Sequence, residues 1–286
     1  MEVFGNRFYS ISDKGLVREK NEDCCKAGMT PNGFLCVLCD GMGGHAGGET
    51  ASRMAVEKIW NFWQATDYAQ VREAMGECLR YANSCVWESA RGIPGLEGMG
   101  TTVCMALLRG KELWYAHVGD SRIYVYEPEA GLCLLTKDHS MVQGMVDQGL
   151  LSEAEARVHP DRNRLVKVLG GKEDVEPDVC ASPFEMENGM SLLVCSDGLS
   201  SYVPEEAIGQ VLAGNGTVHD KCSELVALAN QAGGEDNVTV QLLAYGSAEA
   251  GSEQPLPALA RPRKRRLAIK IIGLLALIFA LLCLTL

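Results

Sequence analysis

The first 260 residues of this chain are short of positive charge. The whole sequence carries 26 lysines and arginines against 37 aspartates and glutamates, and six of the basic residues lie after residue 260. This leaves 20 basic against 37 acidic residues in residues 1–260, a formal charge of −17. Such an acidic body argues against nucleic-acid binding through phosphate contacts and is compatible with bound divalent cations. We therefore expect no nucleic-acid partner.

A signal-peptide pattern and a second cysteine pair at zinc-site spacing are also missing. The chain has 12 cysteines, and many of them lie inside apolar runs. This pattern favours reduced, buried thiols in the cytosol over a disulfide scaffold. Cys36 and Cys39 match C-x-x-C within a strand-like run, and we interpret this pair as core packing rather than a metal site.

The length and the apolar content set the scale of the fold. With 286 residues, of which 47% are hydrophobic, the chain can build one large domain or two small ones with a substantial core. Strand-like apolar runs follow one another, several with only turn-sized gaps, which favours antiparallel pairing. These runs are Arg7–Ser12, Phe34–Cys39, Thr102–Leu108, Glu112–Val118, Arg122–Tyr126, Leu132–Leu135, Ser191–Ser196 and Val238–Ala244.

Helix-like stretches lie in separate groups from the strand-like runs. Two long ones, Glu49–Gln64 and Tyr68–Ala90, have apolar residues at three- and four-residue spacing. Shorter ones are expected at Ser140–Gln148, Pro204–Leu212 and His219–Ala232. This grouping predicts an α+β fold in which helices pack on antiparallel sheets.

The composition changes after residue 245. Residues 246–262 are rich in Gly, Ser, Ala, Glu and Pro without any periodicity, which is typical of a flexible linker. A basic run at residues 263–266 then precedes the apolar residues 267–286, in which Lys270 is the only charge. As a helix rising ~1.5 Å per residue, this apolar stretch would match the hydrocarbon core of a bilayer, about 30 Å thick.

We interpret residues 263–286 as a basic juxtamembrane stretch and a single C-terminal transmembrane helix, with Lys270 snorkelling to the headgroups. The positive-inside rule would keep the basic run in the cytoplasm. Residues 1–245 would then form a domain that faces the cytoplasm and is anchored to the cell membrane. The alternative is a buried C-terminal helix of the globular domain.

Three aspartates stand beside or close to glycine at the ends of strand-like runs: Asp40, Asp197 and Asp236. Each alone is ordinarily a turn residue, and the glycine lets backbone or ligand approach closely. An aspartate at the end of a buried strand, however, needs a positive partner. The motifs around them, DGMGG, DG and GGEDN, contain no histidine or cysteine, so an all-oxygen ligand set would suit Mg²⁺ or Mn²⁺ rather than zinc.

Two such ions sharing a carboxylate supply a hydroxide near neutral pH and a clamp for a phosphoryl group. The aspartates therefore indicate two-metal hydrolysis of a phosphate ester. A two-metal nuclease would use similar ligands but fits poorly with the acidic body. Cys85 and Arg91 match the C-x5-R signature of cysteine-dependent phosphatases, yet this stretch has no glycine and continues a helical pattern, so we reject that reading.

Six short motifs occur in order along the chain. They are DKGLVREKNED (13–23), DGMGG (40–44), GTT (100–102), GDSR (119–122), SDG (196–198) and EDN (235–237). Together they resemble the bacterial branch of the metal-dependent PP2C (PPM) protein serine/threonine phosphatases, over about residues 7–245. The resemblance implies an α/β/β/α sandwich, in which helices cover two central antiparallel sheets and metal ions bind at one end.

The resemblance also implies a ligand set. Asp40 would bridge two Mn²⁺ or Mg²⁺ ions, Gly41 would offer its backbone carbonyl to the second ion, and Asp197 and Asp236 would complete the first site. A possible third ion would map onto Asp120 with Asp197.

Further residues would assist these ligands. Glu22 and Asp23 would hold metal-bound waters, with Asn237 beside them, and Arg18 would receive the substrate phosphate through its planar fork. From the residues alone, Arg18 could instead form a surface ion pair with Glu22 or Asp23. Asp120 could likewise be a residue of a hairpin turn between two strands.

Met42 departs from the eukaryotic pattern, in which a histidine of this loop is proposed as the general acid. Methionine cannot donate a proton, so a metal-bound water or another side chain would protonate the leaving oxygen, with His45 as one candidate. The segment between His139 and Gly171 resembles the family's flap, and its basic residues could meet phosphopeptide.

The implied activity is hydrolysis of phosphoserine and phosphothreonine in proteins by direct, in-line attack of a metal-activated water. Phosphorylated proteins would be the substrates, and a transmembrane serine/threonine kinase is the expected opposing partner. The alternative is a catalytically silent module that binds phosphoproteins or relays a membrane signal. A decayed site would be expected to lose a ligand, whereas all four proposed ligand positions carry competent residues.

Overall fold

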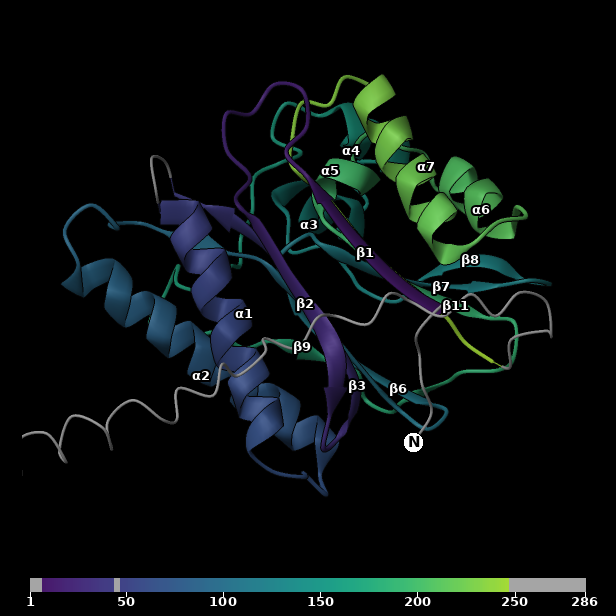
Figure 1. The fold of residues 1–286 in the computed structure, drawn as a ribbon. Coiled ribbons are helices and arrows are strands. Elements are labelled where there is room, and N and C mark those ends of the chain that lie inside the picture. Colours follow the sequence, from purple (N-terminus) through teal and green to yellow (C-terminus); the bar gives the residue numbers. More distant parts are fainter. Residues whose placement is uncertain (1–6, 44–46, 247–286) are drawn as a thin grey trace, which may run out of the picture. The chain divides into compact units, whose positions relative to one another are not determined.

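The computed structural model describes residues 7–43 and 47–246. These residues build two antiparallel sheets with helices on their outer faces (Figure 1). One sheet has five strands in the order β1-β12-β11-β7-β8. Its strands are β1 (Phe8–Asp13), β7 (Arg122–Glu127), β8 (Gly131–Leu134), β11 (Ser191–Cys195) and β12 (Val238–Ala244).

The second sheet has seven strands, with β10-β6-β5-β3-β2 along its main path, β4 paired to β3 and β9 paired to β6. The strands are β2 (Asp23–Thr30), β3 (Gly33–Met42), β4 (Gly100–Thr101), β5 (Val103–Arg109), β6 (Glu112–Val118), β9 (Asp178–Val179) and β10 (Phe184–Glu185). Every pairing in both sheets is antiparallel.

Long helices cover the outer face of each sheet (Figure 1). Helices α1 (Gly47–Ala65) and α2 (Val71–Gly92) pack on the seven-stranded sheet, and α6 (Glu205–Ala213) and α7 (Val218–Gln231) pack on the five-stranded one. Three shorter helices complete the described chain. They are α3 (Met141–Asp147), α4 (Glu153–Val158) and α5 (Asp197–Ser200).

The alternation of side chains along β3 explains the layers. Leu35 and Val37 join the core beneath α1 and α2, whereas Phe34 and Leu38 join the core between the two sheets. Because successive side chains of a strand point to opposite faces, a continuous apolar run is what a strand buried on both sides requires. A third core, beneath α6 and α7, completes the predicted sandwich.

Cys36 and Cys39 lie on opposite faces of β3, one in the core between the sheets and one in the core under the helices. Both thiols are free and buried, so the predicted core packing is confirmed. Cys85 and Arg91 lie within the continuous helix α2, which provides no phosphate loop. The rejection of the C-x5-R reading therefore agrees with the structure.

The predicted α+β fold with two antiparallel sheets is confirmed. All the strands and helices predicted within residues 7–246 are present, with ends that differ by at most three residues. The short strands β4, β9 and β10, the longer β2, and the helices α4 and α5 were not predicted.

Within the described ranges, no helix combines the length and apolar character needed to cross a bilayer. The predicted linker after Gly246, the predicted transmembrane segment at residues 263–286 and His45 lie outside the described residues.

Candidate metal centre

Carboxylates from separate parts of the chain lie close together at one end of the strands of both sheets. Asp23 opens β2 and lies directly opposite Asp40 of β3 in the antiparallel register. Asp197 follows β11 as the first residue of α5, and Asp236 lies just before β12. The structure thus brings together the three aspartates predicted from strand ends, with Asp23 beside them.

Asp23 connects the two sheets through hydrogen bonds. Its Oδ2 atom accepts from the hydroxyl of Ser196 at 2.8 Å and from the hydroxyl of Thr239 at 2.7 Å. Ser196 follows β11 and Thr239 lies on β12, so both donors belong to the five-stranded sheet, whereas Asp23 belongs to the other one. The Asp23 carboxylate therefore holds the strand ends of the seven-stranded sheet against those of the five-stranded sheet.

The backbone of Asp40 is held by two threonines. Its N–H donates to Oγ1 of Thr102 at 3.0 Å, and its carbonyl oxygen accepts from Oγ1 of Thr101 at 2.8 Å. Thr102 Oγ1 also shares a 2.7 Å hydrogen bond with Oγ of Ser121, the residue after Asp120. This chain of contacts fixes Asp40 relative to the loop that carries Asp120.

Gly41 is required by the close approach of helix α1. A Cβ atom at Gly41 would come within 2.1 Å of the carbonyl oxygen of Gly48, so no larger residue fits. The N–H of Gly41 donates to the carbonyl of Glu22 at 3.2 Å, and the Glu22 carboxylate lies so close to Gly48 that a Cβ there would clash with it. Glu22 thus packs against the first turn of α1.

The negative charges of this cluster repel one another. Burial, followed by the charges of Asp23, Asp197 and Asp120, raises the pKa of Asp40 well above its usual value. Burial and the charge of Asp236 raise the pKa of Asp197 to about 6. For Asp23, burial outweighs the two hydroxyl hydrogen bonds and raises the pKa to about 7. Ionising all of these groups together requires positive charge nearby.

Two oxygens of the cluster are buried without a hydrogen-bond donor: Oδ1 of Asp23 and Oδ1 of Asp197. An ionised carboxylate can only accept, and a buried acceptor without a partner costs free energy. Neighbouring carboxylates with unused lone pairs, and no histidine or cysteine ligand among them, are the donor set of hard divalent ions. The residues therefore fit Mn²⁺ or Mg²⁺.

Arg18 lies at the rim of the cluster, with its side chain 50% exposed. Its guanidinium donates to Oδ2 of Asp236 at 2.8 Å and to the carbonyl of Glu235 at 3.3 Å. The alternative ion pair with Glu22 or Asp23 is therefore wrong, because Arg18 reaches across to the loop before β12.

Asn237 ties the loop of Arg18 to the centre. Its side-chain amide donates to the carbonyls of Lys14 and Lys20 at 2.9 and 2.8 Å, and its Oδ1 accepts from the N–H of Glu22 at 2.8 Å. These three bonds place Arg18 and Glu22 relative to Asp236.

Asp120 does not belong to a hairpin. The strands on either side of it, β6 and β7, belong to different sheets, so the loop passes from one sheet to the other. The hairpin alternative is therefore wrong. Asp120 is only 9% exposed, and burial with the charges of Asp197 and Asp138 raises its pKa well above the usual range.

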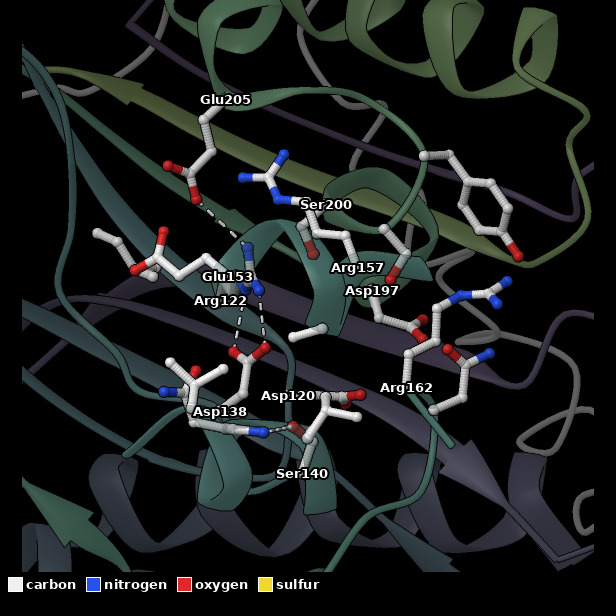
Figure 2. Close-up of a pocket in the computed structure, with 18 of the residues that line it drawn as sticks. Asp120, Arg122, Asp138, Ser140, Glu153, Arg157, Arg162, Asp197, Ser200 and Glu205 are labelled. Atoms are coloured by element: carbon white, nitrogen blue, oxygen red, sulfur yellow. Dashed lines mark hydrogen bonds and ion pairs between the residues drawn. The ribbon is translucent and has the colours of Figure 1, made fainter. Parts of the chain in front are cut away.

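A cavity of about 530 Å³ opens beside Asp120 and Asp197 and extends to α3 and α4 (Figure 2). Arg157 and Arg162 of the predicted flap line it. At its floor, the guanidinium of Arg122 donates to both oxygens of Asp138, at 2.9 and 2.7 Å. The cavity therefore carries groups of both signs.

Five hydroxyl residues that make contacts of the centre have no role in the sequence-based prediction. Four lie inside the quoted motifs (Thr101, Thr102, Ser121 and Ser196), and Thr239 lies in none. The local signal in the sequence is that Thr239 is a polar residue inside an apolar run. In the structure the side chain of Thr239 is fully buried.

The comparisons with known proteins agree with this geometry. The family model described as protein phosphatase 2C matches residues 16–237. The serine/threonine protein phosphatase PstP of Mycobacterium tuberculosis is 37% identical over 252 residues, 88% of this chain, which spans 47%, about half, of the length of that relative. The serine/threonine phosphatase stp of Listeria monocytogenes is 34% identical over 249 residues, 85% of this chain and 97% of that protein.

Solved structures share the fold. A serine/threonine phosphatase of S. agalactiae superposes with a TM-score of 0.79 at 35% identity, covering 84% of this chain and 99% of that one. The catalytic domain of PstP in complex with two manganese ions gives a TM-score of 0.73 at 36% identity, covering 82% of this chain and 96% of that one. This chain, which is similar to the bacterial serine/threonine phosphatases PstP and stp, therefore belongs to the protein phosphatase 2C family.

Proposed function

We propose that this chain is a metal-dependent phosphatase that hydrolyses phosphoserine and phosphothreonine in proteins. The observation that carries the proposal is the meeting of Asp23, Asp40, Asp197 and Asp236 at one edge, with raised pKa values for the first three. Family membership supports the same activity. The buried orphan oxygens of Asp23 and Asp197 are the local feature that calls for cations.

In this proposal two ions would be held by Asp40, shared between them, by the carbonyl of Gly41 and by the carboxylates of Asp197 and Asp236. Bound there, two divalent ions supply charge neutralisation for the phosphoryl group and an activated water for in-line attack. A third ion would lie between Asp120 and Asp197, both of which line the cavity.

The chain's own residues hold the reacting groups in place. Glu22 and Asp23 orient water, because Glu22 is pinned by Asn237 and Asp23 by two hydroxyls. Arg18 is half exposed and lies next to Asp236, so its remaining donors can orient the substrate phosphate. Positioning of this kind accounts for much of the rate enhancement in phosphoryl transfer.

The direct test uses the purified full-length chain with p-nitrophenyl phosphate and with a phosphothreonine peptide. We expect EDTA to abolish hydrolysis of both, and Mn²⁺ or Mg²⁺ to restore it. Iodoacetamide should leave activity intact, because no cysteine takes part. Activity that survives chelation but is lost on alkylation would overturn the proposal.

The proposal extends to the domain organisation and the cellular location. Residues 1–245 form the phosphatase domain, residues 246–262 a flexible linker and residues 263–286 a basic stretch with a transmembrane helix. The support is the composition of the sequence: a basic run followed by apolar residues with one charge. The domain would face the cytoplasm, where it would oppose a membrane-bound serine/threonine kinase.

Deleting residues 263–286 tests the anchor. The full-length chain is expected in the membrane fraction and the shortened chain in the supernatant, with equal activity on the phosphopeptide. A shortened chain that stays with the membranes would show that the anchor lies elsewhere.

A further inference from the structure

His139 holds Gly119, the residue before Asp120, through two hydrogen bonds. The N–H of Gly119 donates to Nδ1 of the His139 ring at 3.0 Å, and the backbone N–H of His139 donates to the carbonyl of Gly119 at 2.9 Å. Gly119 has a φ of +107°, and a Cβ there would lie 2.6 Å from Thr102. The loop that carries Asp120 is therefore tightly fitted at Gly119 and is fixed there by His139.

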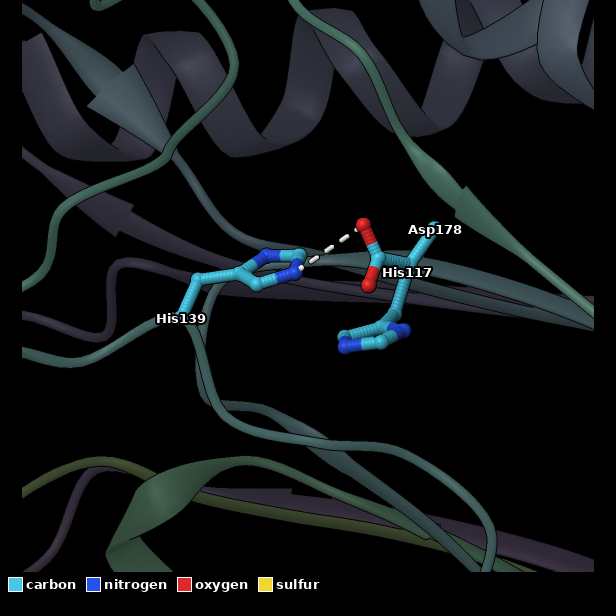
Figure 3. A group of neighbouring side chains, drawn as sticks. All are labelled: His117, His139 and Asp178. Carbon is cyan, nitrogen blue, oxygen red and sulfur yellow. Dashed lines mark ion pairs between the residues drawn. The ribbon is translucent and has the colours of Figure 1, made fainter. Parts of the chain in front are cut away.

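The contacts of His139 define which ring nitrogen carries the proton. A backbone N–H can only donate, so Nδ1 must be the acceptor and the proton must lie on Nε2. Nε2 faces Oδ1 of Asp178 at 3.2 Å, a partner that accepts this proton (Figure 3). Burial and the neighbouring His117 lower the pKa of His139, which keeps the ring neutral.

His117, His139 and Asp178 lie close enough together to suggest a metal site (Figure 3). Hydrogen bonds, however, already use these atoms. The ammonium of Lys167 donates to Oδ1 of Asp178 at 2.8 Å, the protonated Nε2 of His139 faces the same oxygen, and Nε2 of His117 lies 2.7 Å from the carbonyl of Lys137. The group therefore serves to fix the His139 ring, which also stacks on His117 at 4.6 Å.

The residue before His139 holds the other side of the same loop. Asp138 accepts two hydrogen bonds from Arg122, two residues after Asp120. Asp138 and His139 thus bracket Asp120, one through Arg122 and the other through Gly119. Within the described part of the chain, no side chain donates a hydrogen bond to the Asp120 carboxylate itself, which is influenced by the charge of Arg122.

We propose that His139 is a positioning residue for Asp120: by accepting from the Gly119 N–H, its Nδ1 atom sets the direction in which the Asp120 carboxylate enters the acidic centre. This inference rests on the proposed function, in which Asp120 is an ion ligand. It assigns His139 no contact with substrate.

The chain offers a stereochemical test of the Nδ1 contact. The side-chain amide of asparagine can place an acceptor where Nδ1 lies, whereas that of glutamine reaches the position of Nε2. Hydrogen exchange of the Gly119 amide is measured by NMR in H139N, H139Q and H139A, with the Leu193 amide of β11 as internal reference. We expect about tenfold faster exchange at Gly119 in H139A and H139Q, and less than threefold in H139N.

A calorimetric Mn²⁺ titration connects this contact to the centre. H139A and H139Q should weaken the weakest resolved Mn²⁺ binding about five- to tenfold and H139N should restore it. In a D120N background, H139A should add no further change, since it would act through Asp120. His219→Asn, an exchange on the exposed face of α7, serves as the matched histidine control and should change neither readout.

The outcomes separate this inference from the proposed activity. Equal Gly119 exchange in H139N and H139Q would overturn the positioning role, whether or not the enzyme turns over phosphopeptide, and so would additive effects of H139A and D120N. If H139A does not fold, the H139N and H139Q pair decides the question alone. A chain that shows the expected exchange pattern but no Mn²⁺-dependent hydrolysis would refute the activity and leave the Gly119 contact standing.

Discussion

Asp23 and Asp40 lie inside paired strands of the seven-stranded sheet, whereas Asp197 and Asp236 lie just outside the strands of the five-stranded sheet. The first pair faces across a ladder of backbone hydrogen bonds, and the carbonyl and N–H of Asp40 are further held by threonines. Asp197 starts a helix of a single turn, and Asp236 follows a pair of glycines with positive φ, Gly233 and Gly234.

In the proposed metal centre, this difference would give the two pairs different tasks. A carboxylate fixed in a strand ladder would keep its position whatever it binds, which suits the bridging role proposed for Asp40. Carboxylates on a short helix and a glycine-rich loop, as proposed for Asp197 and Asp236, would adjust to ion size and to substrate. The first pair, Asp23 and Asp40, is called the rigid side, and Asp197 and Asp236 the adjustable side. The hydrogen bonds from Ser196 and Thr239 to Asp23 connect the two sides.

Asp40→Asn would break the rigid side and should have the largest effect. We expect kcat for phosphopeptide to fall at least about 10³-fold, roughly 4 kcal/mol of transition-state stabilisation, because a neutral amide cannot bridge two cations. In EDTA the variant should melt no lower than the parent, since the change removes a buried charge that its neighbours repel. Steady-state kinetics and calorimetry check both.

Asp67→Asn is the matched control, because Asp67 is exposed and, among the described residues, forms its ion pair with Arg109. It should leave kcat unchanged. If Asp40→Asn hydrolyses p-nitrophenyl phosphate as fast as the parent, Asp40 is not a bridge.

Asp236→Asn would test the adjustable side. We expect the Mn²⁺ concentration for half-maximal activity to rise about 10- to 100-fold, with much of kcat regained at saturating metal, because a loop ligand can be replaced in part by water. A Mn²⁺ titration of initial rates measures this. A loss that saturating Mn²⁺ cannot recover, as large as that of Asp40→Asn, would remove the distinction between the two pairs.

The same comparison explains what could be predicted from the sequence. Asp40, Asp197 and Asp236 are predictable because each stands at or near one end of a continuous apolar run, which the sequence shows without knowledge of its partner strands. The strand β2, which begins at Asp23, was not predicted. It is an edge strand whose sequence, DCCKAGMT, has little alternation, and it is defined by pairing to β3 and by packing under α1.

Contacts between distant segments set the remaining features. Thr239 is separated from Asp23 by 216 positions, and Arg18 from Asp236 by 218, so no local pattern links them. The one-turn helix α5 is too short to show a periodicity. The ladder register that opposes Asp23 to Asp40 likewise follows from the assembled sheet.

The raised pKa values predict how stability without metal depends on pH. An aspartate titrates near 3.9 when unfolded, whereas Asp197 and Asp23 titrate at about 6 and about 7 when folded. The folded state therefore binds more protons between these values, and stability should fall as pH rises from about 4 to about 7. Summed over these two groups, we expect a loss of roughly 4 kcal/mol between pH 5 and 7.5 in EDTA, about 8–16 °C in Tm.

Mn²⁺ should reverse this trend, because ionised carboxylates bind it and binding stabilises the folded state. Scanning calorimetry with EDTA and with Mn²⁺ gives both slopes. A Tm in EDTA that rises across this pH range would contradict the picture of a crowded acidic centre.

Thr239→Val would remove one of the hydrogen bonds that connect Asp23 to the five-stranded sheet, and it should have the smallest effect. The change keeps the shape of the side chain but removes the hydroxyl that donates to Oδ2 of Asp23, so we expect a loss of about 1 kcal/mol, or about 2–4 °C in Tm at pH 7.5 with Mn²⁺. Because that hydrogen bond lowers the pKa of Asp23, its loss should also move the pH midpoint in EDTA upward. Thr239→Ser keeps the hydroxyl and should leave that midpoint unchanged; a shift equal to that of valine would mean that packing, not the hydrogen bond, joins the sheets at Asp23.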